Sequence, residues 1–117
     1  MRINQAICEN LKNYPYLCNI HLERRIEGED CYDYELTLEF CNIPHYYVED
    51  KIRIVFLNVK NLKMQNLDGL FYTDIVVKDL KNHQLENINY YVEESEENMF
   101  SFYCSSIELD INSSKEV

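Results

Sequence analysis

Apolar and polar residues alternate along most of this chain, and this alternation predicts β-strands separated by short turns. The segment 99–111 organises the rest. Its apolar positions fall into two sets whose phase differs by one residue, namely Phe100, Phe102 and Cys104, then Ile107, Leu109 and Ile111. Because strand side chains point to opposite faces with period two, both sets reach one core only if an extra residue lies at Ser105–Ser106. We therefore predict a long, bulged central strand that curves a sheet around the core.

The first forty residues predict a helix and a hairpin. Ile3, Ile7 and Leu11 recur every four residues and predict a short helix over 3–13, before Pro15. Strands are predicted over 17–26 and 32–40, joined by a turn at 27–30 into an antiparallel hairpin. In the first strand, the residues expected to face the core are Cys18, Ile20 and Leu22.

The remaining segments predict further strands. A strand covers 51–57, and its phase slips near Asn58, which fits either a bulged long strand or a tight hairpin. Another covers 71–80, where Ile75-Val76-Val77 suggests burial on both faces, and a third covers 88–92 before an acidic tip at 93–98.

The whole chain, residues 1–117, is expected to form a single domain, with a flexible tail at 112–117. The fold class is mainly β (α+β): a short N-terminal helix against a curved antiparallel sheet or half-barrel of six to seven strands.

Charge narrows the classes of partner. The formal net charge is −10, and no Lys or Arg lies between Arg25 and Lys51 or between Lys81 and Lys115. Binding to nucleic-acid backbone or to an anionic membrane surface needs the opposite sign, so we expect neither. A basic protein partner is the natural complement. With an odd count of five cysteines, no CxxC pair and no apolar leader, we expect reduced thiols and a cytoplasmic protein.

Catalytic and metal-binding patterns are weak in this sequence. His21-x-Glu23 lacks the downstream PCxxC that completes a zinc deaminase site, and a surface pair is the simpler interpretation. Cys31, Cys41 and His45 match no compact zinc spacing. Cys18 and Cys104 lie in phase with apolar neighbours, which favours small core residues over a nucleophile. We therefore predict no enzyme activity, no metal and no cofactor.

Tyrosines beside acidic residues suggest a protein interface, since Tyr is enriched where proteins bind one another. The predicted contact residues lie in acidic turns or beside exposed tyrosines. They are Glu27, Glu29, Asp30, Asp33, Tyr46, Tyr47, Glu49, Asp50, Tyr91, Glu93, Glu94, Glu96 and Glu97.

Four segments together resemble a family of small bacterial immunity proteins, the neutralisers encoded beside polymorphic toxins, in the group numbered fifty of that series. The segments are Tyr14–Ile20 (YPYLCNI), Tyr34–Phe40 (YELTLEF), Ile54–Leu62 (IVFLNVKNL) and Phe100–Glu108 (FSFYCSSIE). The chain departs from that pattern at Cys18-Asn19, where the family has His-Asp, so no role of that pair carries over. The resemblance implies a cytosolic, non-catalytic protein whose partner is a toxin domain.

The leading hypothesis is therefore an immunity-type inhibitor that neutralises a toxin domain through an acidic, Tyr-containing surface. The alternative is a small-molecule-binding domain or weak enzyme with its site inside the curved sheet. A structural or oligomerising module is the third hypothesis.

Overall fold

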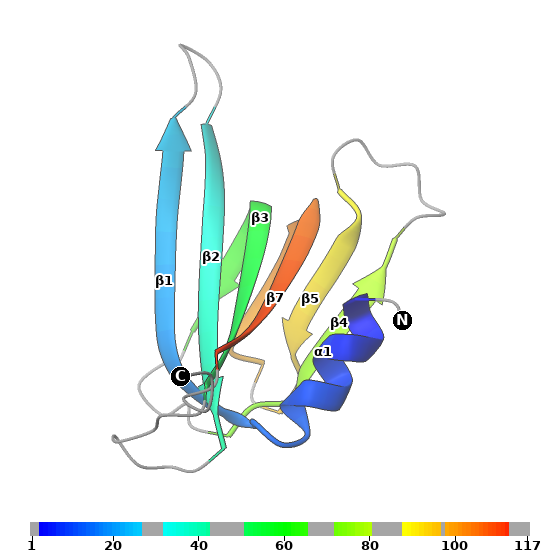
Figure 1. Cartoon of the computed structure of the whole chain (residues 1–117). Coiled ribbons are helices and arrows are strands. Elements are labelled where there is room, and N and C mark those ends of the chain that lie inside the picture. The colour runs from blue at the N-terminus through cyan, green and yellow to red at the C-terminus, as the bar shows by residue number, and fades with distance from the viewer. Residues whose placement is uncertain are drawn as a thin grey trace.

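The computed structural model describes residues 3–26, 32–42, 51–65, 72–80, 88–96 and 98–112. This part of the chain contains a helix, α1 (Ile3–Leu11), and the strands β1 (Tyr16–Ile26), β2 (Tyr32–Cys41), β3 (Lys51–Met64), β4 (Ile75–Asp79), β5 (Tyr90–Glu94), β6 (Phe100–Cys104) and β7 (Ser106–Asn112). The strands form one open antiparallel sheet in the order β1-β2-β3-β6-β5-β4, and β7 also pairs with β3 (Figure 1). The predicted class, a short helix with a mainly antiparallel sheet, is confirmed.

Strands β1 and β2 form the predicted hairpin, which projects beyond the neighbouring strands in Figure 1. Leu36, Leu38 and Phe40 of β2 are fully buried, as their alternation predicts. The prediction for Cys18 is wrong. The register shifts between Leu17 and Asn19, so Cys18 is the extra residue of a bulge and its side chain is exposed, while Leu17 packs against the core.

Strand β3 is a bulged long strand, which decides between the two alternatives near Asn58. Its first half pairs with β2 and β7, and its second half pairs with β6. Asn58 and Asn61 both have φ of 56° and lie where the register slips. Asparagine tolerates this left-handed region better than most residues, so each can accommodate an irregularity of the strand.

Segment 99–112 forms the predicted bent strand, divided into β6 and β7 at Ser105. Phe100, Phe102 and Cys104 are buried, and β7 resumes with Ile107 opposite Phe56 and Leu109 opposite Ile54. Ile107 and Leu109 therefore pack against the same core as the apolar residues of β6, and Phe56 and Phe102 meet edge to face with ring centroids 4.8 Å apart. The predicted irregularity at Ser105–Ser106 is confirmed.

The core fills the inner face of the bent sheet, and α1 adds Ile7 and Leu11 to it. The two ends of the sheet are tied at one point by the bridge between Tyr16 and Tyr72. Thr73 reinforces this link because its backbone N and its Oγ1 both donate to Pro15 O, at 2.8 and 2.9 Å.

Other predicted boundaries differ by a few residues. The predicted strand over 71–80 is observed as β4 (Ile75–Asp79), in which Ile75 and Val77 are buried and Val76 is half-buried, so burial is strong on one face only. Strand β7 runs to Asn112, the first residue of the predicted tail. The predicted turn at 27–30 lies outside the described residues, as do residues 43–50, 66–71 and 81–87. None of the helical segments that the structure describes is long and apolar enough to cross a membrane.

Candidate partner-binding surface

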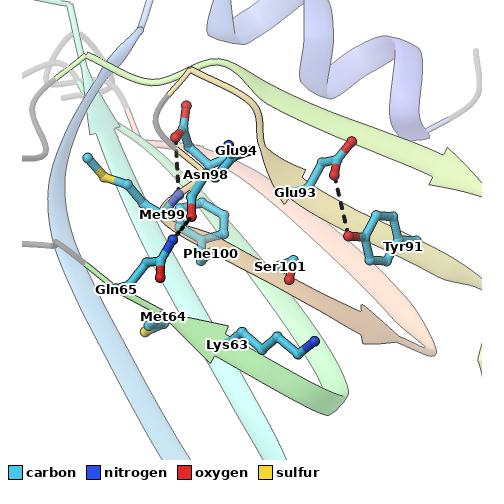
Figure 2. A pocket seen from close by; sticks show the side chains of 10 residues that line it. All are labelled: Lys63, Met64, Gln65, Tyr91, Glu93, Glu94, Asn98, Met99, Phe100 and Ser101. Atoms are coloured by element: carbon cyan, nitrogen blue, oxygen red, sulfur yellow. Dashed lines mark hydrogen bonds between the residues drawn. The ribbon is translucent and has the colours of Figure 1, made fainter.

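The outer face of β3, β6, β5 and β4 carries a cluster of aromatic and charged side chains, which we call the tyrosine patch: Lys63, Lys78, Tyr91, Glu93, Ser101 and Tyr103. Adjacent strands bring them together, since Tyr91 lies opposite Tyr103 and Glu93 lies opposite Ser101. The Tyr91 and Tyr103 rings pack at a tilt, with centroids 4.9 Å apart. Tyr91 Oη donates to Glu93 Oε2 at 3.3 Å (Figure 2).

Lys78 joins the patch from β4, the neighbouring strand. Its Nζ lies 3.8 Å from Glu93 Oε1 and 5.7 Å from the centroid of the Tyr91 ring. These are mostly solvent-exposed contacts, which contribute little stability but hold the aromatic ring and the carboxylate in one orientation. The patch is therefore of mixed charge and has an aromatic centre.

A shallow hollow of about 240 Å³ adjoins the patch where β3 ends and β6 begins. Lys63, Gln65 and Asn98 lie along it, and Gln65 Nε2 donates to Asn98 O at 3.0 Å (Figure 2). A second hollow of about 430 Å³ is lined in part by Leu62, Tyr91 and Tyr103. The outer face is therefore uneven, and each hollow has room for a side chain of a partner protein.

The outer face of β1, β2, β3 and β7 is a separate surface, which we call the charged face. The register aligns its residues in rows across the four strands. Its acidic members are Glu23, Asp33, Glu35, Glu39, Glu108 and Asp110, and its basic members are Arg25, Lys51 and Arg53.

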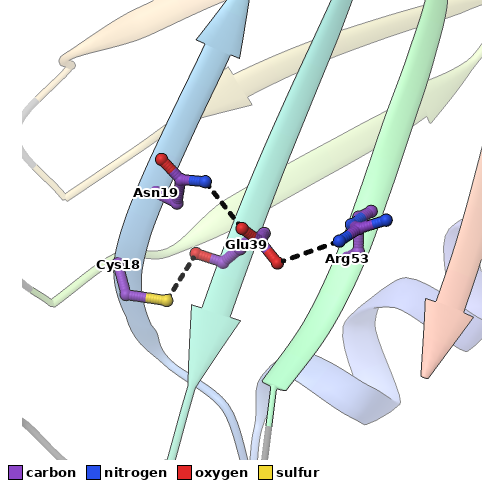
Figure 3. Close-up of polar contacts among 4 residues, drawn as sticks. All are labelled: Cys18, Asn19, Glu39 and Arg53. Carbon is purple, nitrogen blue, oxygen red and sulfur yellow. Dashed lines mark hydrogen bonds and ion pairs between the residues drawn. The ribbon is translucent and has the colours of Figure 1, made fainter. Parts of the chain in front are cut away.

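Glu39 lies at the centre of a hydrogen-bonded group on the charged face (Figure 3). Asn19 Nδ2 donates to Glu39 Oε1 at 2.6 Å, and Arg53 Nη2 donates to Glu39 Oε2 at 3.5 Å. The hydrogen bond from Asn19 and, secondarily, the positive charges of Arg53 and Lys51 hold the pKa of Glu39 below its ordinary value.

The bulge at Cys18 places its thiol beside the same group, and Cys18 Sγ donates to Glu39 O at 3.3 Å (Figure 3). Partial burial raises the pKa of Cys18 to about 11, and the adjacent Cys41 and Glu39 add to the shift. Burial alone raises the pKa of Cys104 to about 12. Both thiols are therefore protonated near neutral pH, which disfavours a role as nucleophile.

Glu94 differs from its acidic neighbours because its side chain is fully buried, with an exposed fraction of 0%. Its carboxylate accepts hydrogen bonds from the backbone N of Asp74 at 3.1 Å, of Glu96 at 2.8 Å and of Met99 at 3.4 Å. Glu94 thus organises the turn between β5 and β6 and the start of β4. It offers no exposed area to a partner, so we remove it from the contact residues.

The described residues include some of the other predicted contacts. Tyr91 and Glu93 lie together in the tyrosine patch, and Glu96 is exposed beyond the end of β5. Asp33 lies apart from them on the charged face. When the oxygen of the Asn58 amide accepts a hydrogen bond from Ser105 Oγ, the nitrogen of that amide lies within hydrogen-bonding distance of the Asp33 carboxylate. Predicted contacts outside the described residues are Glu27, Glu29, Asp30, Tyr46, Tyr47, Glu49, Asp50 and Glu97.

The predicted contact residues omit Tyr103, Lys63 and Lys78, which the strand register brings beside Tyr91. The alternation of segment 99–104 places Tyr103 opposite in phase to Phe102 and Cys104, so its exposure could be inferred from sequence. The two lysines could not be found in this way, because they come from strands whose pairing is not encoded locally.

The interior of the bent sheet is occupied by apolar side chains, including Ile54, Phe56 and Phe102, each with no exposed area. This packing counts against a ligand site inside the sheet. His21 and Glu23 are both exposed on the outer face of β1, as expected of a surface pair. Within the described ranges, no three His, Cys, Asp or Glu residues cluster closely enough to hold a metal ion; Cys31 and His45 lie outside those ranges.

Comparison with known proteins gives one finding. The profile of the family described as Immunity protein PIM8 matches residues 2–110. No curated protein and no solved structure matches the chain significantly. The match confirms the predicted class, an immunity protein, and gives the family as PIM8 in place of the group numbered fifty.

Proposed function

The chain belongs to the immunity protein family PIM8, and from that membership we propose that it neutralises a toxin domain by binding it through the tyrosine patch and the acidic residues around it. The toxin is the partner that the family implies. The finer parts of the proposal are a basic partner, a contact surface centred on Tyr91 and Glu93, inhibition without catalysis, and action in the cytoplasm of a bacterium.

The observation that carries the choice of surface is the contact of Tyr91 with Tyr103 and Glu93 on an outer sheet face. Tyrosine combines a large apolar ring with a polar hydroxyl and is enriched among residues that dominate binding energy. Here the Tyr91 hydroxyl is already oriented by Glu93, and its ring by Tyr103 and Lys78. A side chain held in this way loses less conformational entropy on binding than a mobile one.

Charge supports a basic partner. The formal net charge of −10 gives the whole molecule a negative field. Glu93 is an acidic member of the patch itself, and Glu96 adds an exposed acidic group beyond the end of β5. Such a field accelerates the association of an oppositely charged protein by roughly 10- to 1000-fold, and salt screens the effect.

A pull-down tests the proposal. The purified protein is immobilised, incubated with lysate of the source bacterium at low ionic strength, and washed with a salt step. We expect the salt fraction to contain a basic protein with a toxin domain. The association rate constant with that protein, measured by stopped flow, should fall as the salt concentration rises. A rate constant that does not depend on salt would contradict the proposed charge steering.

Variants then test the surface. Tyr91→Ala should weaken toxin binding by about 30-fold, as expected for a hot-spot tyrosine. Glu93→Lys should slow association and reduce its dependence on salt. Glu9→Lys is the matched control, because it makes the same change of charge at an exposed position on α1. The proposed surface is wrong if Tyr91→Ala and Glu93→Lys bind as the Glu9 variant does.

A further inference from the structure

Strand β1 is the end strand of the sheet, and its outer half is unusually open. Every residue from His21 to Ile26 is exposed, although the strand stays paired with β2 along its whole length. The pairing of β2 with β3 stops at Tyr34, so the hairpin continues past its last neighbour (Figure 1). In the part of the chain that the structure describes, the topology places no strand beyond β1 except at the single bridge to Tyr72.

This edge also exposes apolar side chains. Leu22 is 44% exposed and Ile26 is 72% exposed, and both lie on the face of β1 that continues the core side of the sheet. An edge strand that is long, regular and partly apolar is a template for pairing with another strand. The edge contains no proline, and its one described irregularity is the bulge at Cys18.

We propose that two copies of this chain pair edge to edge through β1, antiparallel and about a two-fold axis at Leu22. This inference concerns self-association and does not rest on toxin binding.

The register follows from the side chains. In this arrangement Leu22 lies opposite Leu22 of the second copy. His21 lies opposite Glu23 of the second copy, and Asn19 lies opposite its Arg25, each pair occurring twice by symmetry. Ile20 lies opposite Arg24 of the second copy, whose aliphatic stem can cover it. No like charges face each other, and the regular stretch of β1 beyond the bulge, 19–25, is paired throughout.

Other registers are less favourable. If one of the two strands slips by one residue, its core-side residues are paired with the outward residues of the other copy, so the apolar side chains no longer lie on one face. If the two-fold axis is moved from Leu22 to Glu23, Glu23 lies opposite Glu23 of the second copy. If the axis is moved to Arg24, Arg24 lies opposite Arg24 of the second copy, and in both cases like charges repel each other. Moving it one residue inward, to His21, brings the bulge at Cys18 into the ladder and shortens the regular pairing.

Sedimentation velocity tests the association. From low micromolar to sub-millimolar concentration, the protein should shift from its monomer mass of 14.1 kDa to twice that value. A protein that stays monomeric across this range overturns the proposal and leaves the β1 edge to a strand of another protein.

Disulfide cross-linking tests the register. In a background in which Cys8, Cys18 and Cys31 are replaced by serine, Leu22→Cys is oxidised with oxidised glutathione, which is reduced as the two thiols lose their protons and join. Directly opposed residues have Cα atoms about 4.5–5.5 Å apart, within the range of a disulfide. Glu23→Cys is the matched control, since its two copies would be diagonal neighbours about 7–8 Å apart.

We expect a cross-linked dimer from Leu22→Cys and little from Glu23→Cys. Equal or reversed cross-linking overturns the register. A charge exchange gives a second test that leaves the thiols untouched. His21→Glu should weaken the dimer by about 3- to 30-fold by opposing two carboxylates at each of two sites, and the double variant with Glu23→His should restore it. Failure of the double variant to recover would also overturn this pairing.

Discussion

Replacing the buried Glu94 by glutamine or alanine measures how strongly one carboxylate holds the turn between β5 and β6. The side chain has no exposed area, and it accepts hydrogen bonds from three backbone N–H groups, those of Asp74, Glu96 and Met99. These bonds tie together the start of β4, the end of β5 and the residue before β6. We therefore expect the substitution to lower global stability and not only to loosen the turn.

The magnitude follows from those bonds. A hydrogen bond to a charged group contributes about 1.5–3 kcal/mol net, and each buried donor left unsatisfied costs about 1–3 kcal/mol. The bond from Met99 N is long, at 3.4 Å, and that from Glu96 lies at an exposed position. We expect Glu94→Gln to reduce the free energy of unfolding by about 1.5–3 kcal/mol, and Glu94→Ala by about 3–5 kcal/mol because it also leaves a cavity.

Urea unfolding followed by far-ultraviolet circular dichroism measures these losses. A chain of this size has a total stability of roughly 6–17 kcal/mol, so both variants should remain measurable. Glu93→Gln is the matched control, because the neighbouring carboxylate lies on the outer face in partly exposed contacts with Tyr91 and Lys78. Its cost should stay below about 1 kcal/mol. A Glu94→Gln variant as stable as Glu93→Gln would refute the structural role of Glu94.

Further predictions concern the core, a thiol and a surface carboxylate. Phe102→Ala should cost about 3–5 kcal/mol in urea unfolding, because it removes the ring that packs on Phe56 across the bend; a cost under about 1 kcal/mol would contradict this packing. Cys18, whose pKa is raised to about 11, should be alkylated by iodoacetamide at about pH 8 roughly tenfold more slowly than an unshifted thiol, because its lower thiolate fraction is partly offset by greater nucleophilicity. Mass spectrometry measures the rate, and an unshifted rate would contradict the raised pKa. The lowered pKa of Glu39 means that its contribution to stability is present above its unfolded-state pKa and is lost as pH falls through its lower folded-state pKa. The stability difference between wild type and Glu39→Gln should therefore shrink on acidification through that window, as urea unfolding across pH will show, and a difference independent of pH would contradict the hydrogen bond from Asn19.

The sequence was sufficient where the relevant information is local. The spacing of Ile3, Ile7 and Leu11 located the helix, and strict alternation located the β1–β2 hairpin and the bent strand. These patterns work because a helix or a half-buried strand must repeat its apolar residues with its own geometric period. The phase change at Ser105 could be found for the same reason, since it interrupts a period that is otherwise regular.

Local patterns failed where strand pairing decides the outcome. Cys18 is in phase with Ile20, yet the bulge makes it the extra residue, and only the register with β2 shows this. Glu94 belongs to a run of acidic residues that is typical of a solvated turn. It is buried because the turn folds back and supplies three backbone donors to its carboxylate. A buried carboxylate with such partners cannot be distinguished from an exposed one by composition.

The bend in the sheet explains why the candidate surface is divided into two parts. Asn58 in β3 and Ser105 between β6 and β7 lie side by side, 2.7 Å apart through their side chains, and each marks the residue where its strand changes phase. Because both strands change phase at the same level, their pairing and the core continue across the bend, as the Phe56–Phe102 contact shows. The outer face turns with them, so the charged face lies on one side of the irregularity and the tyrosine patch on the other. The two neighbouring irregularities thus determine where the charged face ends and where the tyrosine patch begins on the outer face of the sheet.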